Sequence, residues 1–166
     1  MIFAMSDTSV IPGPLAVRNL FEDLLGRDVT VSPGTPMEQA DVPTAALAIF
    51  TDTAQQLYAV LGMQLSLAAH AGAALGLLPA GAAEDSIEEK KLTPALAENV
   101  FELCNVLTSL LNVGGAPHVK LYQVVYPGVT PPADAVAHLM ALGRRLDLTI
   151  EVARYGKGKF SLSLAP

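Results

Sequence analysis

The sequence predicts a single α+β domain in which helices pack on a largely antiparallel sheet. Segments with helical periodicity alternate with short segments of period two, and two pairs of strand-like segments are joined by turns short enough for hairpins. The chain has 166 residues, 51% of them hydrophobic, which is enough to bury one sizeable core. We expect this domain to span residues 14–166, after a mobile N-terminal leader at residues 1–13.

The first half of the chain is expected to hold two helices and three strands. In order, they are a helix over 16–26, a strand over 28–31, a loop over 32–41, strands over 45–50 and 56–61, and a helix over 65–77. Pro14 precedes the first helix and Gly26 ends it. The apolar run 61–78 is about long enough to cross a membrane. Because polar residues and glycines interrupt this run, we interpret it as a buried core helix.

The second half is expected to hold two further helices and three strands. In order, they are a charged solvated connection or helical lead-in over 84–91, a helix over 93–113, a strand over 118–126, a helix over 132–145, and strands over 148–154 and 159–164. The last two strands are expected to form a hairpin through residues 155–158. A strand so near the C-terminus is expected at a sheet edge, where it would pair with a second copy or be covered by the helix over 132–145.

The helix over 93–113 carries the residues whose spacing indicates chemistry. At about 100° per residue, one narrow stripe of this helix is polar. It consists of Glu98, Glu102, Asn105, Ser109 and Asn112. The opposite face is apolar and consists of Leu92, Leu96, Val100, Leu103, Leu107, Leu110 and Leu111. Two carboxylates and a carboxamide are therefore expected to point outward together.

Two interpretations of this stripe are open on periodicity alone. Any amphipathic surface helix carries polar residues opposite its core face, so the stripe is typical of a solvated surface. Asn105 and Asn112, however, are poorer helix formers than Lys, Gln or Glu, and each costs roughly half a kcal/mol relative to Ala. An Asn in the middle of a helix therefore calls for a separate explanation.

The element order and this motif together resemble the CheX/CheC chemotaxis phosphatase family. The family motif is an acidic residue or Ser, three residues, Glu, two residues, and Asn, which Glu98, Glu102 and Asn105 match. The resemblance in element order extends from Pro14 to the C-terminus. It implies a CheC-like fold.

The resemblance also implies an activity and a partner. Family members hydrolyse the aspartyl phosphate of a CheY-type receiver domain. Glu102 would pair with the lysine of the receiver, Asn105 would orient the attacking water, and Glu98 and Ser109 would contact the partner. The receiver supplies the magnesium ion, so no cofactor is expected in this chain. The alternative is a non-catalytic binding or assembly module of the same fold.

Composition excludes several other classes of function. With 10 Lys and Arg against 16 Asp and Glu, the net charge of −6 disfavours nucleic-acid binding. The single cysteine, Cys104, excludes an internal disulfide and is expected to be a packing residue in a reducing compartment. The N-terminus lacks the pattern of a signal peptide. A cytoplasmic location is therefore expected.

No other catalytic or metal-binding pattern stands out in the sequence. His70, His118 and His138 are isolated from one another and from any acidic cluster at ligand spacing, so we expect hydrogen-bonded or surface histidines rather than metal ligands. The stretch 156–159, Gly-Lys-Gly-Lys, lacks the spacing of a phosphate-binding loop.

Overall fold

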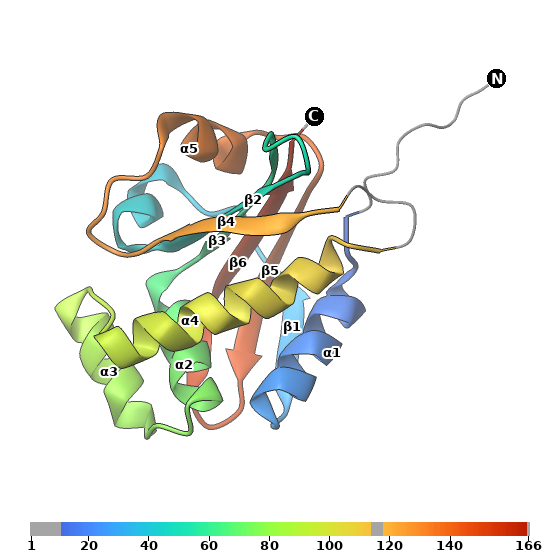
Figure 1. The fold of residues 1–166 in the computed structure, drawn as a ribbon. Helices are drawn as coiled ribbons and strands as arrows, with labels where there is room; N and C mark the ends of the chain where they lie inside the picture. Colours follow the sequence, from blue (N-terminus) through green and yellow to red (C-terminus); the bar gives the residue numbers. More distant parts are fainter. Residues whose placement is uncertain (1–10, 114–117, 166) are drawn as a thin grey trace.

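One six-stranded antiparallel sheet forms the centre of the molecule (Figure 1). The computed structural model describes residues 11–113 and 118–165. The strands are β1 (Val29–Pro33), β2 (Ala46–Thr51), β3 (Leu57–Met63), β4 (Lys120–Val125), β5 (Arg145–Val152) and β6 (Gly156–Leu164). They lie in the order β1-β5-β6-β3-β2-β4, and every neighbouring pair is antiparallel. The predicted fold class is confirmed, whereas most of the predicted leader lies outside the described residues.

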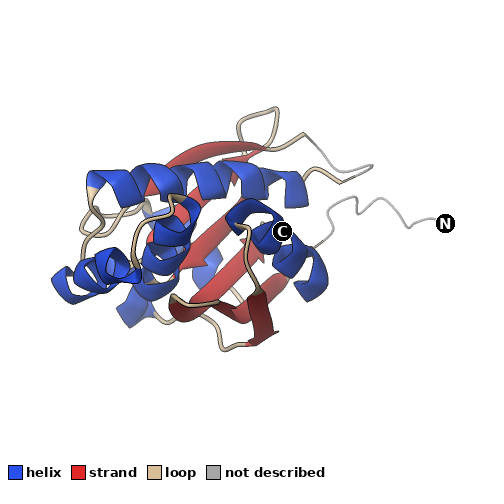
Figure 2. Cartoon of the chain, turned by 90° about the horizontal axis from the view of Figure 1, so that it is seen from below, coloured by secondary structure: helices blue, strands red, loops and turns tan. Residues whose placement is uncertain are grey.

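Helices cover both faces of this sheet. They are α1 (Pro14–Leu25), α2 (Leu65–Leu75), α3 (Ala80–Glu89), α4 (Pro94–Leu107) and α5 (Ala133–Met140), with 3-10 helices η1 (Gln39–Thr44) and η2 (Thr108–Leu110). α1, α2 and α4 share the larger hydrophobic core with one face, and α5 and η1 form a smaller core on the other. Figure 2, seen from below, shows the helices packed along the twisted sheet.

The order of elements repeats once along the chain. α1, β1, η1, β2 and β3 are followed, after α2 and α3, by α4, β4, α5, β5 and β6. The sheet order is symmetric about the β6–β3 pair, so β1 corresponds to β4 and β2 to β5. Both α1 and α4 lie on the face that holds the larger core. α1 therefore occupies in the first half the place that α4 occupies in the second.

The elements of the first half agree with the sequence, with one shift. Gly26 ends α1 with a φ of +67°, a left-handed conformation that glycine adopts without strain. The predicted loop over 32–41 is shorter than expected, because β1 reaches Pro33 and η1 begins at Gln39. α2 is buried along most of its length, as predicted for a core helix. In the described part of the chain, no helix is long and apolar enough to cross a membrane.

The terminal hairpin lies inside the sheet, so the prediction that it borders the sheet is wrong. β6 pairs with both β5 and β3, and the edge strands are β1 and β4. The hairpin turn is also earlier than expected, at residues 153–155. Ser161 and Ser163 of β6 are buried and hydrogen-bonded: Ser161 Oγ accepts from Met37 N at 3.0 Å, and Ser163 Oγ donates to the His138 carbonyl at 2.8 Å. The predicted pairing of this hairpin with a second copy therefore has no free edge to use.

The last predicted helix is shorter than expected. α5 ends at Met140, and Arg145 already begins β5. Arg145 nevertheless caps the helix, because its Nη1 donates to the carbonyls of Leu139 at 2.8 Å and Ala141 at 2.6 Å. Most of the charged segment over 84–91 belongs to α3, in agreement with the helical alternative for this segment.

Candidate functional site

α4 is positioned by its apolar face and by its N-terminal cap. Thr93 is the N-cap residue, and its hydroxyl accepts a hydrogen bond from Leu96 N at 3.3 Å. Pro94 follows at the first helical position, where its missing N–H costs nothing. The residues that face the core are the ones that the periodicity predicted. They include Leu96, Val100, Leu103, Leu107 and Leu111, all buried.

Two polar contacts fix α4 against its neighbours. Asn99 Nδ2 donates to the Gly72 carbonyl of α2 at 2.9 Å, and the Tyr126 hydroxyl donates to the Ala97 carbonyl at 3.2 Å. Gly76 lies against Asn99 so closely that a Cβ atom there would overlap the Asn99 amide. Since α2 and the end of β4 both hold the helix, its outer face is presented on a rigid support.

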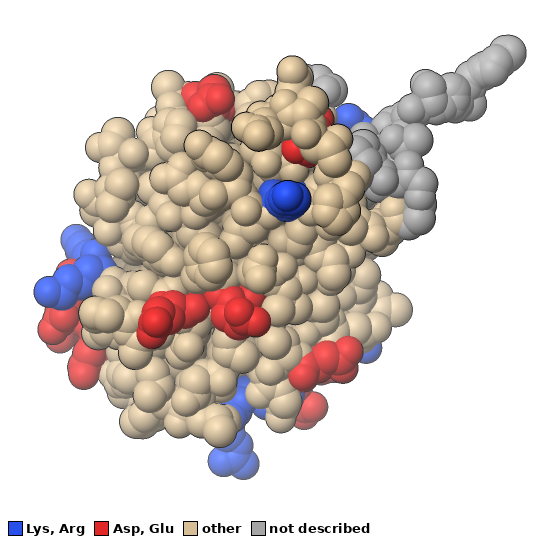
Figure 3. Space-filling view, in the orientation of Figure 1, with Lys and Arg blue, Asp and Glu red and all other residues tan. Residues whose placement is uncertain are grey.

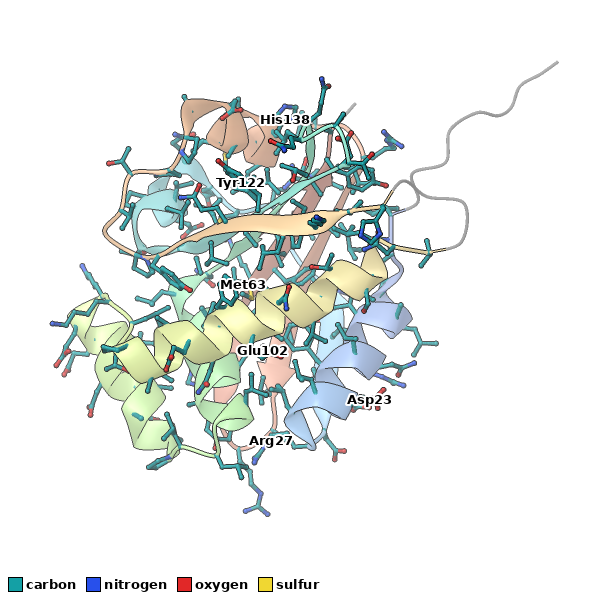
Figure 4. The ribbon with its side chains drawn as sticks, viewed as in Figure 1. Asp23, Arg27, Met63, Glu102, Tyr122 and His138 are labelled. Atoms are coloured by element: carbon teal, nitrogen blue, oxygen red, sulfur yellow. The ribbon has the colours of Figure 1, made fainter. Side chains whose placement is uncertain are left out.

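The outer face of α4 presents the predicted motif. Glu98, Glu102 and Asn105 are all exposed and lie on one uninterrupted α-helix, as expected. Within the described residues, none of these three side chains forms a hydrogen bond or an ion pair. In Figure 3 two acidic patches lie over α4, surrounded by uncharged surface, and Figure 4 labels Glu102 on this helix.

The helix ends earlier than predicted, after the motif. The α-helix stops at Leu107 and tightens into η2, while the Thr108 hydroxyl donates to the Cys104 carbonyl at 3.4 Å. Ser109 stays exposed, but on the 3-10 turn. Asn112 does not continue the stripe and bonds to Val119 instead. Its Nδ2 donates to the Val119 carbonyl at 2.8 Å, and its Oδ1 accepts from the Val119 amide at 2.7 Å. The predicted continuous helix over 93–113 is therefore wrong in its last third.

α1 provides an internal comparison for this face. Its glutamate, Glu22, accepts a hydrogen bond from Val29 N at 3.0 Å and lies 3.9 Å from Arg18 Nε. Asn19 Oδ1 accepts from the Arg18 guanidinium at 3.1 Å. The corresponding helix of the first half thus uses its acid and amide side chains in contacts of its own, whereas α4 leaves Glu102 and Asn105 available.

Phe101 joins the same face and was not predicted. Its side chain is 46% exposed, although the other described phenylalanines, Phe21, Phe50 and Phe160, are at most 1% exposed. On a helical wheel Phe101 lies about 60° from the polar stripe rather than opposite it. This angle could have predicted the exposure of Phe101 from the sequence. Phenylalanine is usually a core residue, however, so its exposure was not expected.

The remaining candidate side chains divide between structure and surface. Cys104 is fully buried, and burial raises the pKa of its thiol to about 12, so it packs as a neutral group, as expected. His118 is exposed and His138 half-buried, but His70 is buried with Nδ1 unpartnered, which contradicts the expectation for this residue. Over residues 11–113 and 118–165, no three His, Cys, Asp or Glu side chains gather as metal ligands would.

Comparison with known proteins establishes the fold. No protein-family model matches the chain, and no curated protein matches its sequence. Among solved structures, FliM from H. pylori in complex with SpeE is similar with a TM-score of 0.60 and 8% identity, covering 89% of this chain and 79% of that one. CheX from Borrelia burgdorferi, in complex with CheY, BeF3 and magnesium, is similar with a TM-score of 0.56 and 10% identity, covering 91% and 94%. FliM from H. pylori in complex with FliG gives 0.56 and 8%, covering 90% and 85%.

These similarities confirm the fold that the sequence resemblance implied. The chain is a single α+β domain of the CheC-like type, a fold shared by CheX and FliM.

Proposed function

Because the chain has the CheC-like fold, we propose that it engages the phosphorylated receiver domain of a CheY-type response regulator and hydrolyses the aspartyl phosphate. Glu102 and Asn105 are the proposed catalytic residues, and Glu98 and Ser109 the proposed partner contacts. Such a partner acts in the cytoplasm, where the proposal places this protein as well. One observation supports the proposal above the others: Asn105 is exposed in the last turn of α4, and its side chain has no partner among the described residues.

The polar residues on the outer face of α4 make the helix less stable, which supports a role for them other than folding. An exposed Asn costs about half a kcal/mol relative to Ala in a helix interior. Glu98 and Glu102 are four residues apart on α4, and two like charges at this spacing destabilise a helix by roughly 0.2–0.5 kcal/mol. Asn99, on the same helix, offsets a similar cost through its bond to the Gly72 carbonyl, but the Asn105 side chain has no such bond among the described residues.

The geometry of the pair suits positioning chemistry. Glu102 and Asn105 are separated by three residues on one α-helix, a rise of about 4.5 Å, so both side chains reach the same small region of a docked partner. A carboxamide both donates and accepts hydrogen bonds, so Asn105 can hold a water molecule in line with a phosphorus atom. Glu102 can pair with a lysine beside the phosphate. Phosphoryl transfer asks for little more than this positioning and electrostatic stabilisation.

The phosphorylated aspartate and the magnesium ion belong to the receiver in this proposal. This chain therefore contributes one water-orienting amide and one or two carboxylates from a rigid helix. In the solved CheX complex, CheX is bound to CheY with BeF3 and magnesium. The similarity of fold motivates the same class of partner here.

A binding or assembly role without turnover is the second candidate. The exposed Phe101 favours it, because an aromatic side chain adds contact area to an interface but does not orient water. FliM, which has the same fold, is found in complexes with SpeE and with FliG. In this case Glu98, Glu102 and Asn105 would serve recognition alone.

Phosphate release from a panel of phosphorylated receiver domains of the same genome tests the proposal. The wild-type protein should accelerate release from at least one receiver, and Asn105→Ala should slow the accelerated rate on the order of 10²-fold. Asn19→Ala makes the same chemical change on the exposed surface of α1 and serves as the matched control. Glu102→Ala should weaken both docking and turnover, with Glu88→Ala on α3 as its control.

The outcomes separate the two candidates. Acceleration that survives Asn105→Ala would refute the mechanism. Binding of a receiver with no acceleration would leave the binding module, and no binding at all would exclude both candidates for receiver domains.

A further inference from the structure

From its exposure and its neighbours, we infer that Phe101 determines the specificity of the α4 face by docking in an apolar depression of the receiver domain. This inference rests on the proposed function, because it names the residue that recognises the same partner. Phe101 acts on binding, whereas Asn105 acts on the chemical step.

The position of Phe101 on α4 leaves its ring partly exposed, and the stability of the helix does not require a phenylalanine there. The residues on either side of it, Val100 and Glu102, point into the core and into solvent respectively, so Phe101 lies at the border between the two faces. Phenylalanine is also a weaker helix former than Ala, Leu or Glu, so helix stability does not account for it. An aromatic ring left about half exposed is typical of a residue that is buried on association.

The surroundings of Phe101 indicate what covers it. Glu98 lies one turn before Phe101, Asn105 lies one turn after it, and Glu102 is adjacent, so the ring is bordered by polar groups that face outward together. No other charged residue belongs to α4, and both of its carboxylates are unpaired in the described structure. A complementary surface must offer a cation for the carboxylates and an apolar depression within one helical turn of it.

Under the proposed function, the partner is a receiver domain with a lysine beside its phosphate. This lysine is the cation that the carboxylates of α4 require. The apolar depression must then lie next to the phosphorylated aspartate of that receiver. Receivers that carry a bulky or charged residue at this point would be excluded by the ring even though their catalytic groups are the same. Phe101 would thereby select among receivers that Glu102 and Asn105 cannot distinguish.

The experiment compares Phe101→Ala and Phe101→Leu with the wild-type protein, using the receiver of the panel that binds most tightly when activated by BeF3 and magnesium. Phe101→Ala should raise both the Kd and the KM roughly tenfold and change kcat less than twofold, because about half of an aromatic side chain is removed from the interface. Phe101→Leu should recover part of the affinity. Leu142→Ala removes an exposed apolar side chain next to α5, on the opposite face of the sheet, and should change nothing.

Each result bears on the inference in a defined way. An unchanged Kd and KM for Phe101→Ala overturns it, and the proposed function still stands if Asn105→Ala lowers kcat. Weakened binding without any phosphate release by the wild-type protein supports the docking role within the second candidate. If Phe101→Ala lowers both kcat and the thermal stability of the protein, the ring belongs to the core, which also overturns the inference. If the wild-type protein binds no receiver, the inference fails together with the proposed function.

Discussion

Asn112 pairs with the backbone of Val119 as a neighbouring strand would. Its Nδ2 donates to the Val119 carbonyl at 2.8 Å, and its Oδ1 accepts from the Val119 amide at 2.7 Å. The side chain thus joins the residues after η2 to the start of β4.

Loss of this side chain should destabilise the domain. Asn112→Ala removes both hydrogen bonds and leaves a partly buried amide and carbonyl of Val119 unpaired, so the free energy of unfolding should fall by about 1–2 kcal/mol. Urea denaturation measures this change in the free energy of unfolding. Ser109→Ala, at an exposed position of η2, should change stability by less than about 0.5 kcal/mol. Equal effects of the two substitutions would refute the assigned role.

The asparagines of α4 should respond in opposite directions. Asn99→Ala removes the bond to the Gly72 carbonyl and should lower the free energy of unfolding by about 1 kcal/mol. Asn105→Ala removes no contact within the described structure and should raise it by up to about half a kcal/mol, because Ala is the better helix former. Denaturation of both variants beside the wild type checks this. Destabilisation by Asn105→Ala would reveal a structural use of that side chain.

His70 should make stability depend on pH. Burial lowers the pKa of His70 below its ordinary value of 6.5, and the nearby Glu84 carboxylate only partly opposes the shift. The unfolded chain therefore binds the proton more readily than the folded one. The free energy of unfolding should be highest above about pH 7 and should fall as the pH drops below about 6.5, levelling off below the folded pKa.

The measurement is a series of urea unfolding curves between about pH 5.5 and 7.5, the range in which histidine titrates. His70→Gln should flatten the dependence, and His118→Gln, at an exposed position, should preserve it. A wild-type protein whose stability rises as the pH falls through this range would contradict the sign derived for His70.

Arg145 should be irreplaceable by lysine. Its guanidinium forms two bonds with Asp147, at 2.8 and 2.9 Å, and its Nη1 also caps the end of α5, while both charged side chains are only 11% exposed. A lysine cannot form the two parallel bonds to Asp147 and cap α5 as well, so Arg145→Lys should lower the free energy of unfolding by about 2–3 kcal/mol. Thermal or urea unfolding measures the loss. Arg154→Lys, in the exposed hairpin turn, is the control, and a similar small effect of both would contradict the prediction.

The sequence was informative wherever local periodicity decides the structure. The core face of α4 and the joint exposure of Glu98, Glu102 and Asn105 follow from 3.6 residues per turn, and both were predicted correctly. The end of α4 was not predictable in this way. The α-helix stops at Leu107, and beyond it Asn112 bonds to Val119 instead of continuing the polar stripe; periodicity does not register such a tertiary hydrogen bond.

The central position of the last strand was not predictable for a related reason. The alternation of Ser161 and Ser163 with Phe160 and Leu162 is typical of a strand with one wet face. Both serines are instead buried beneath the second core, where Met37 N and the His138 carbonyl satisfy their hydroxyls. A polar residue whose partner is distant in sequence looks the same, in the sequence alone, as one that faces water.

The central pairing of β6 with β3 has a consequence for biosynthesis. Ala59 pairs with Leu164, so the middle of the sheet joins segments roughly one hundred residues apart, a highly non-local contact. While a ribosome is still translating the second half, the hairpin of β2 and β3 has emerged with the apolar edge of β3 unpaired. The nascent chain must therefore keep that edge from aggregating until β6 follows, and the domain completes its sheet only after Leu164 has left the exit tunnel.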